Sequence, residues 1–177
     1  MGYTTEFSGE FRLDRPLTEE QATYLRQFAS TRRMSRREAV VSEMPDPVRE
    51  AVGLPLGPEG AYVVGGPGFM GQEVDASVAS QNQPPSGQPS LWCQWTPTPD
   101  RAGLVWDGGE KFYHYAEWLE YLIKHFLAPW GYALSGTVKW AGEEPGDTGV
   151  IEVDNNHITA REGEDGAAQL TAGLPRP

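Results

Sequence analysis

The residues best spaced for chemistry stand at the start of a long aromatic segment, at Glu110, His114 and Glu117. Steps of four and three residues would place two carboxylates and an imidazole on one face of a helix, as in helices that bind metal ions. His125 would lie about 16 Å further along the helix axis, so the two imidazoles cannot share one ion. These residues and Tyr121 also fall opposite the apolar face, where a solvated surface with pairs to Lys124 is expected. We therefore predict a solvated helix face here and no metal site.

Asp107 is a further candidate for chemistry, because it ends an apolar segment and is followed by two glycines. A carboxylate at the end of a strand can face a cleft, where active sites often lie. The glycines also permit Asp107 to cap the next helix or to close a turn, and this structural role is favoured. Asp107, Glu110 and His114 are the catalytic candidates, and none of them is assigned a reaction.

A glycine-rich segment, residues 65–72, follows a short apolar run at residues 61–64. The backbone amides of such a loop can hold phosphate. However, the glycines match Gly-x-Gly-x-x-Gly only in part, no Gly-Lys-Ser/Thr follows, and Pro67 removes one amide donor. An irregular loop is therefore favoured over a phosphate site.

Five arginines stand close together in a chain that is otherwise acidic. Guanidinium groups bind carboxylate and phosphate through paired hydrogen bonds, so an exposed cluster could receive a nucleotide, a nucleic-acid backbone or an acidic protein. The favoured alternative is that the arginines pair with the protein's own acids or complement the end of the preceding helix. The cluster consists of Arg26, Arg32, Arg33, Arg36 and Arg37.

Three tryptophans occupy a predicted pair of neighbouring strands, at Trp92, Trp95 and Trp106. Trp92 and Trp95 face opposite sides of a regular strand, so at least one tryptophan is expected away from the main core. Packing is the favoured role, and stacking on a planar ligand or partner is the alternative. The candidates for binding a ligand or partner are therefore Arg32, Arg33, Arg36, Arg37, Trp92 and Trp95.

Composition fits one folded domain: the chain has 177 residues, of which 38% are hydrophobic and 11% aromatic. No cofactor is expected. The net charge of −11 disfavours general nucleic-acid binding, since phosphate would be repelled over most of the surface. One cysteine, Cys93, excludes an intramolecular disulfide and fits a reducing compartment. No apolar run reaches the roughly 20 residues that span a bilayer, and the first residues lack a secretory signal. A cytoplasmic location is expected.

Hydrophobic periodicity predicts mostly strands, with helices at two places in the order. Thr18 and Gln21 form a capping box at the start of one helix, and a wide apolar face marks another over Phe112–Trp130. The fold class expected is α+β: a single domain, mainly an antiparallel sheet, with the long helix and a smaller N-terminal helical segment packed on one face. The domain covers residues 1–161, and residues 162–177 form a mobile acidic tail. The expected strands are residues 3–13, 61–64, 91–96, 103–107, 133–141, 148–154 and 157–161, with a tight turn at residues 154–156. Two shorter helices are expected: one capped by Ser35 and running through Arg37 to about Ser42, and one over Pro47–Val52 with Asp46 as its cap.

Several segments resemble a family of small uncharacterised proteins of actinobacteria and their phages. The resemblance covers most of the chain up to about Asn155. It implies an intracellular or phage-associated setting and no catalytic assignment. The segments that carry it are Tyr3–Phe7, Gly68–Gln72, Asp75–Val78, Gln88–Trp95, Trp106–Tyr113, Glu117–Ile123 and His125–Leu127.

These patterns favour a non-enzymatic binding or regulatory protein that acts on a protein or a small anionic partner. One alternative is an enzyme for a nucleotide or another phosphorylated small molecule. It would use Asp107, Glu110 and His114 for acid–base or metal chemistry and residues 32–37 to hold the phosphate. Another alternative is an acidic protein that mimics nucleic acid, which requires C-terminal carboxylates ordered on one face.

Overall fold

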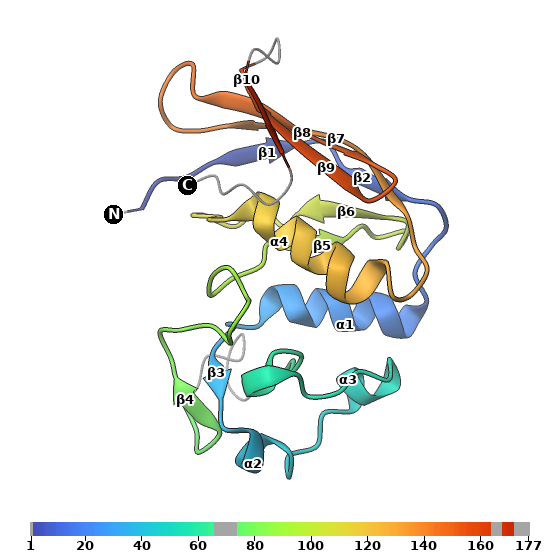
Figure 1. Ribbon diagram of the computed structural model, residues 1–177, viewed down its shortest axis with the longest axis vertical. Helices are drawn as coiled ribbons and strands as arrows, with labels where there is room; N and C mark the ends of the chain where they lie inside the picture. The colour runs from blue at the N-terminus through green and yellow to red at the C-terminus, as the bar shows by residue number, and fades with distance from the viewer. Residues whose placement is uncertain (1, 66–73, 164–167, 172–177) are drawn as a thin grey trace. The chain divides into compact units, whose positions relative to one another are not determined.

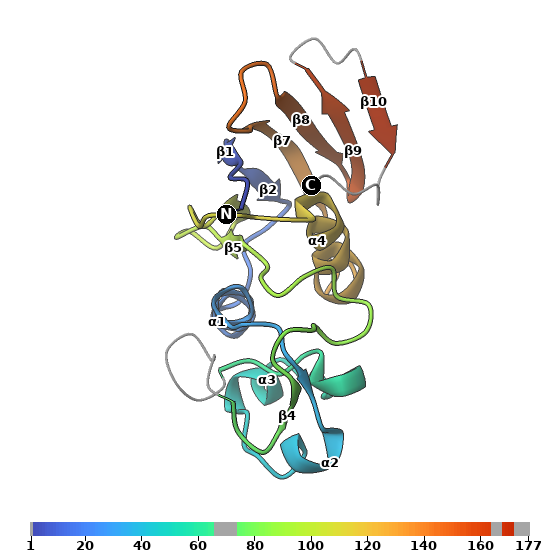
Figure 2. The same ribbon diagram turned by 90° about the vertical axis from the view of Figure 1, so that its left-hand side faces the viewer.

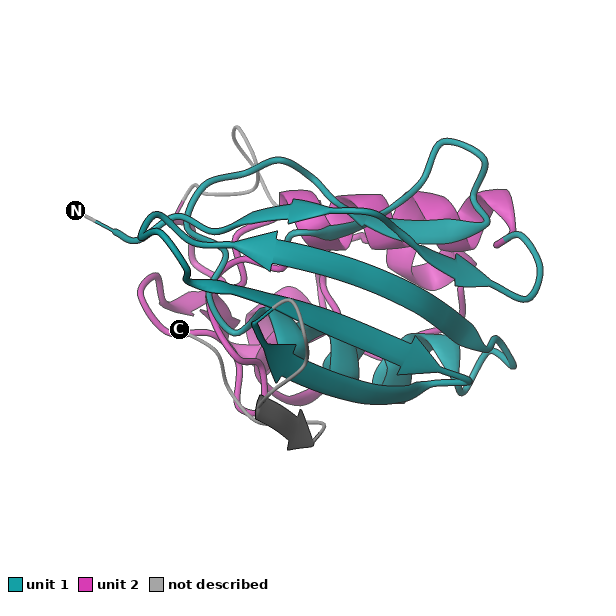
Figure 3. Ribbon diagram, turned by 90° about the horizontal axis from the view of Figure 1, so that it is seen from above, with its two compact units in different colours: residues 1–16, 94–177 teal, residues 17–93 magenta. Residues whose placement is uncertain are grey.

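The computed structural model describes residues 2–65, 74–163 and 168–171, and the chain divides into two compact units. Unit 1 comprises residues 1–16 and 94–177, and unit 2 comprises residues 17–93 (Figure 3). Unit 2 is therefore an insertion, in sequence, between two strands of unit 1. The predicted boundary of one domain over residues 1–161 stays a prediction.

Unit 1 is built on an antiparallel sheet, so the expected α+β class with a mainly antiparallel sheet is confirmed (Figure 1). Its described strands run in the order β10-β9-β8-β7-β2-β6-β5, and β1 also pairs with β7. The strands are β1 (Glu6–Ser8), β2 (Phe11–Leu13), β5 (Trp95–Pro97), β6 (Gly103–Trp106), β7 (Leu134–Ala141), β8 (Thr148–Asp154), β9 (His157–Glu162) and β10 (Ala168–Thr171).

The meander of β7, β8 and β9 lies within one residue of its predicted bounds. Its alternating apolar residues meet across the strands: Val138 is opposite Ile151, which is opposite Ala160, and all three are buried. Asn155 and Asn156 adopt φ values of 48° and 70° and join β8 to β9 in a tight turn, as expected for these residues.

The N-terminal strand differs from the prediction, because residues 3–13 form two short strands rather than one. Gly9 lies between β1 and β2 with a φ of 99°, which favours glycine, and a Cβ there would lie 2.9 Å from the carbonyl oxygen of Thr137. Both strands nevertheless pair with β7, and β2 also pairs with β6. The predicted strand 91–96 is likewise shorter, since only β5 is extended and paired.

The long helix begins later and ends earlier than predicted. It comprises α4 (Tyr115–Leu122), followed by a π-helical segment, η3 (Ile123–Leu127). His114 takes a left-handed φ of 57°, so the helix cannot extend back to Phe112. Within unit 1, α4 covers one face of the sheet near β5 and β9 (Figure 2). Its apolar face is buried as predicted, but Tyr121, expected on the polar face, is only 7% exposed.

Aromatic rings form the core under α4. Phe7, Phe11 and Phe112 each lie 5.3–5.5 Å from Trp95 between ring centroids, and Tyr115 lies 4.9 Å from Phe7. Most of these pairs meet edge to face, the arrangement that aromatic quadrupoles favour. The core of unit 1 therefore joins β1, β2, β5 and α4.

Unit 2 is mostly helix and turn, with one two-stranded antiparallel sheet. The predicted capping box is confirmed: Thr18 Oγ1 accepts from the Gln21 amide, and Gln21 Oε1 accepts from the Thr18 amide, both at 3.1 Å. Its elements are α1 (Glu19–Ser30), β3 (Ser35–Arg36), α2 (Glu38–Val41), α3 (Pro47–Ala51), η1 (Pro58–Gly60) and β4 (Val78–Ser80).

Two local predictions for unit 2 are wrong. Residues 61–64 form no strand, because the carbonyls of Ala61 and Val63 accept hydrogen bonds from an arginine side chain. Asp46 precedes α3 but does not cap it; its Oδ2 accepts from Arg49 Nε and from the Val64 amide, each at 3.2 Å. Side-chain acceptors and donors therefore replace regular structure in this part of the chain.

Two other predictions fall wholly or partly outside the described residues. All of the glycine-rich segment 65–72 except Gly65 lies outside them. The expected tail, residues 162–177, contains β10, which pairs with β9 from Ala168 opposite Glu162 to Thr171 opposite Thr159. Among the described helices, none is both long enough and apolar enough to cross a bilayer.

Candidate functional site

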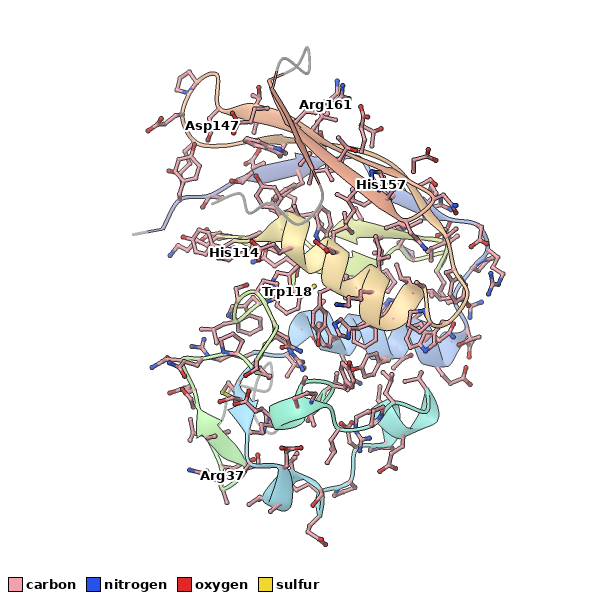
Figure 4. The ribbon with its side chains drawn as sticks, viewed as in Figure 1. Arg37, His114, Trp118, Asp147, His157 and Arg161 are labelled. Atoms are coloured by element: carbon pink, nitrogen blue, oxygen red, sulfur yellow. The ribbon has the colours of Figure 1, made fainter. Side chains whose placement is uncertain are left out.

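No described contact brings the three predicted catalytic residues together. Asp107 is exposed after β6, and its Oδ1 accepts from the Gly109 amide at 2.8 Å, which is turn chemistry. Glu110 is exposed, and His114 at the start of α4 has its Nδ1 3.2 Å from Glu117 Oε1 (Figure 4). Nor does any group of three or more His, Cys, Asp or Glu within the described ranges have metal-binding geometry. Within the part of the chain that the structure describes, the enzymatic alternative therefore has no assembled site to support it.

The turn role of Asp107 can be tested by its effect on stability. Burial by the surrounding protein raises the pKa of its carboxyl, although the Gly109 amide opposes this. A carboxyl with a raised folded pKa stabilises the fold below its unfolded pKa, and this contribution is lost as pH rises through the folded pKa. Asp107→Asn keeps the acceptor for Gly109 and removes the charge. We therefore expect equal or slightly higher stability at neutral pH, by less than about 1 kcal/mol because the residue is also solvent exposed.

Urea unfolding of Asp107→Asn from mildly acidic to neutral pH measures this effect. The variant should lose less stability than the parent as pH rises, and Glu110→Gln controls for the change in net charge. A clear loss of stability of Asp107→Asn at neutral pH would contradict the assigned turn role.

Two of the arginines that were binding candidates are buried inside unit 2. Arg33 is 2% exposed; its Nη2 donates to the carbonyls of Ala61 and Val63, both at 2.8 Å, and its guanidinium lies 4.0 Å from the centroid of the Phe28 ring. Arg36 is 5% exposed, and its Nη1 donates to Ser77 Oγ at 2.7 Å. Neither residue belongs to an exposed anion-binding surface.

The other two candidate arginines hold neighbouring turns. Arg32 is half-buried, and its Nε donates to the carbonyl of Gln81 at 3.0 Å. Arg37 is exposed near β4, and its Nη1 donates to the carbonyl of Ala76 at 3.0 Å (Figure 4). The described partners of these four arginines are mainly backbone carbonyls. The sequence analysis had considered only acidic side chains and a helix end as partners.

The two candidate tryptophans have different surroundings. Trp95 is 1% exposed, and its Nε1 donates to the carbonyl of Tyr115 at 2.9 Å, so it packs in the core of unit 1 and cannot stack on a ligand. Trp92 is half-buried in unit 2. Trp106 is half-buried, and its Nε1 donates to Gln94 Oε1 at 3.1 Å.

The largest ligand-sized hollow among those described in unit 1 was not predicted. It is an open groove of about 570 Å³. We call it the aromatic groove and define it by Tyr3, Tyr113, Trp140, Glu144 and Asp147. Sites for small molecules typically occupy roughly 300–1,000 Å³.

The connection between β7 and β8 forms one wall of the aromatic groove. The Gly142 amide donates to the carbonyl of Asp147 at 2.7 Å, and the Asp147 amide donates to the carbonyl of Glu144 at 3.1 Å. Gly146 has a φ of 83° after Pro145, a sequence suited to a tight turn. This closed turn directs Glu144 and Asp147 to the groove, and Figure 4 shows Asp147 on this connection.

Tyr3 links that wall to the N-terminal segment. Its hydroxyl donates to Asp147 Oδ2 and accepts from the Glu144 amide at 3.2 Å, while its own amide donates to the Tyr113 hydroxyl at 3.2 Å. The hydrogen bond to Asp147 raises the pKa of Tyr3, because it stabilises the protonated phenol. A Cβ at Gly142 would collide with both Tyr3 and Asp147, so glycine is needed for this approach.

The groove had no sequence signal, because 110 residues separate Tyr3 from Tyr113. The antiparallel register of β1 and β7 explains the juxtaposition. Glu6 is opposite Ala141, so the chain just before β1 runs alongside the chain just after β7. Knowledge of that single pairing would have brought Tyr3 to residues 144–147.

Comparisons of the chain with family models, with curated proteins and with solved structures found no match. The resemblance to small proteins of actinobacteria and their phages therefore stays a prediction. The chemistry of the candidate site rests on its own geometry.

Proposed function

We propose that this is a non-enzymatic binding protein whose aromatic groove holds an organic ammonium group. The observation that supports it is a groove of about 570 Å³ lined by two half-buried tyrosines, Tyr3 and Tyr113, by the largely buried Trp140 and by two carboxylates. Aromatic faces attract cations through the ring quadrupole, and cages of aromatic residues bind quaternary ammonium groups. Carboxylates beside such rings add charge complementarity.

The charge of unit 1 favours a cation over an anion at this groove. Residues 1–16 and 94–177 carry 16 acidic and 8 basic side chains, which gives the unit a net charge of −8 with neutral histidines. An acidic surface raises the local concentration of cationic ligands. The small anionic partner favoured by the sequence therefore suits this groove poorly, although a binding role without catalysis is retained.

Binding also fits the groove better than catalysis. The hydroxyl of Tyr3 already donates a hydrogen bond to Asp147 and accepts one from the Glu144 amide, and its raised pKa keeps it protonated. A general base needs a free acceptor near the proton that it removes. The Tyr3–Asp147 pair instead provides a fixed, hydrogen-bonded wall.

Titration with choline tests the proposal, and 3,3-dimethylbutan-1-ol, its neutral isostere, is the matched control ligand. We expect saturable binding of choline by calorimetry, with chemical-shift changes at the Trp140 indole. The neutral isostere should bind roughly tenfold more weakly, because it keeps the shape but loses the attraction to the rings and carboxylates. Equal binding of the two compounds, or none of choline, would count against the proposal.

Substitutions locate the interaction. Asp147→Asn should weaken choline binding several-fold, whereas Asp154→Asn removes an equal charge at the exposed β8–β9 turn and should leave it unchanged. The stem of Lys111 and the Tyr113 hydroxyl both lie against Gly2. Lys111→Gln should therefore strengthen choline binding modestly, since it removes a like charge near the groove. The same affinity in Asp147→Asn and in the parent would exclude the groove as the site.

A regulatory role, a cytoplasmic location and a phage or actinobacterial setting are part of this proposal and rest on the sequence alone. A protein partner would bind through the same chemistry by presenting a methylated lysine side chain. A peptide with trimethyl-lysine, compared with the same peptide carrying norleucine, distinguishes a protein ligand from a free small amine.

A further inference from the structure

Unit 2 contains a second, much smaller cavity, of about 50 Å³. We call it the Arg36 pocket. Its polar side chains are Arg36 and Asp46, and its apolar lining includes Val41, Leu56 and Val63. A water molecule needs roughly 10–15 Å³ of such space, so the pocket holds a group of only a few heavy atoms.

Arg36 lines this pocket, and one of its hydrogen-bond donors lacks an acceptor. Arg36 is 5% exposed, its Nη1 is paired with Ser77 Oγ, and its buried Nη2 has no hydrogen-bond partner among the described residues. Leaving a buried donor unpaired is costly, and more so when the group is charged. An acceptor from outside the described chain is therefore expected at this position.

The guanidinium is held firmly in its place. The Ser77 hydroxyl and amide both donate to Asp75 Oδ1, at 2.5 and 2.8 Å, so Ser77 presents a fixed lone pair to Arg36. A Cβ at Gly60 would lie 3.0 Å from Arg36 Cβ, which shows how closely the stem of Arg36 packs. Such an anchored donor is preorganised for a ligand.

The second polar residue of the pocket has its charge compensated. Asp46 Oδ2 accepts from Arg49 Nε and from the Val64 amide, each at 3.2 Å. Burial lowers the pKa of Arg36 while Asp75 and Asp46 raise it, and an arginine in a protein stays a cation. The pocket thus offers one anchored cationic donor beside apolar walls.

We propose that the Arg36 pocket binds a short aliphatic carboxylate. One carboxylate oxygen accepts from Arg36 Nη2, and the alkyl group lies against Val41, Leu56 and Val63. Guanidinium–carboxylate hydrogen bonds are charge-assisted and stronger than neutral ones. This site lies in unit 2 and is separate from the aromatic groove, so it extends the proposed function and does not depend on it.

Titration with sodium propionate, followed by NMR of arginine Nε–H groups and of valine and leucine methyl groups, tests this site. We expect saturable shifts at Arg36, Val63 and Leu56, with a dissociation constant in the millimolar range for so small a ligand. Propionamide should bind roughly tenfold more weakly, because it lacks the charge. Benzoate should not bind, because its ring exceeds the pocket. Shifts no larger than those caused by sodium chloride at equal ionic strength would mean that water satisfies Nη2, and would overturn the proposal.

Three variants separate binding from folding. Arg36→Gln should abolish the propionate shifts, whereas Arg37→Gln alters the exposed neighbour and should preserve them. Arg36 is buried, so its replacement also risks unfolding unit 2. Leu56→Phe keeps Arg36, fills the pocket from a half-buried position and should also prevent binding. Undiminished propionate binding by Leu56→Phe would overturn the proposal even if Arg36→Gln failed to fold.

Discussion

Trp95→Ala should lower the free energy of unfolding by about 4 kcal/mol, the largest effect that we expect from one substitution in unit 1. Trp95 is 1% exposed, its ring contacts Phe7, Phe11 and Phe112, and its Nε1 donates to the carbonyl of Tyr115. Alanine would open a cavity where β1, β2, β5 and α4 meet, and would leave a buried carbonyl without its donor.

Urea unfolding followed by circular dichroism measures the loss, with Trp130→Ala as the matched control. Trp130 is half-buried and its ring lies 5.8 Å from Phe126, so its removal should cost less than about 1.5 kcal/mol. Trp95→Phe keeps an aromatic ring but loses the indole donor and should have an intermediate effect. A small loss in Trp95→Ala, comparable to that in Trp130→Ala, would contradict the central position that we assign to Trp95.

Arg33→Met should destabilise unit 2 by about 3 kcal/mol, although methionine preserves much of the apolar stem. The Arg33 guanidinium donates hydrogen bonds to the carbonyls of Ala61 and Val63 and lies over the Phe28 ring. Its removal takes the Arg33 donor from the Val63 carbonyl and leaves the Ala61 carbonyl only its hydrogen bond from Gln88 Nε2 at 2.7 Å. It also removes a desolvated cation–π contact. The loss should appear first as faster hydrogen exchange around residues 61–64.

The control for Arg33→Met is Arg37→Met, four residues further along the chain. Arg37 is exposed, so its hydrogen bonds to the carbonyls of Ala76 and Val78 compete with water, and we expect a loss below about 1 kcal/mol. Arg33→Lys keeps the charge but lacks the planar fork, and should lose about 2 kcal/mol. Equal unfolding midpoints for Arg33→Met and Arg37→Met would show that the buried guanidinium is not structural.

Both predictions concern residues that the sequence made binding candidates. Arginine and tryptophan are enriched at binding sites, but both are also used to fill interiors when their polar atoms find partners. For Trp95 and Arg33 those partners are backbone carbonyls. A carbonyl is present at every residue, so nothing in the residue types distinguished the two roles.

Local sequence was enough to predict the elements that depend on neighbouring residues. Hydrophobic period and turn preference act over a few residues, so local patterns predict such elements. Four examples are the capping box at Thr18, the apolar stripe of α4, the strands of the β7–β9 meander and the turn at Asn155–Asn156. Local patterns also predicted the α+β class, since they indicated the kind and order of the elements.

Which distant segments meet became clear only in the folded chain. The pairing of β2 with β6 and β7 makes residues 17–93 an insertion in the sequence of unit 1. The pairing of β1 with β7 brings together the residues of the aromatic groove. In unit 2, residues 61–65 lie against Arg33 and Arg36 and form part of the Arg36 pocket. Periodicity tells which face of an element is buried, but not what buries it. The groove and the Arg36 pocket are made by such long-range pairings. The groove therefore had no signal in the sequence, and Arg36 was predicted only as part of an arginine cluster and not as part of a pocket.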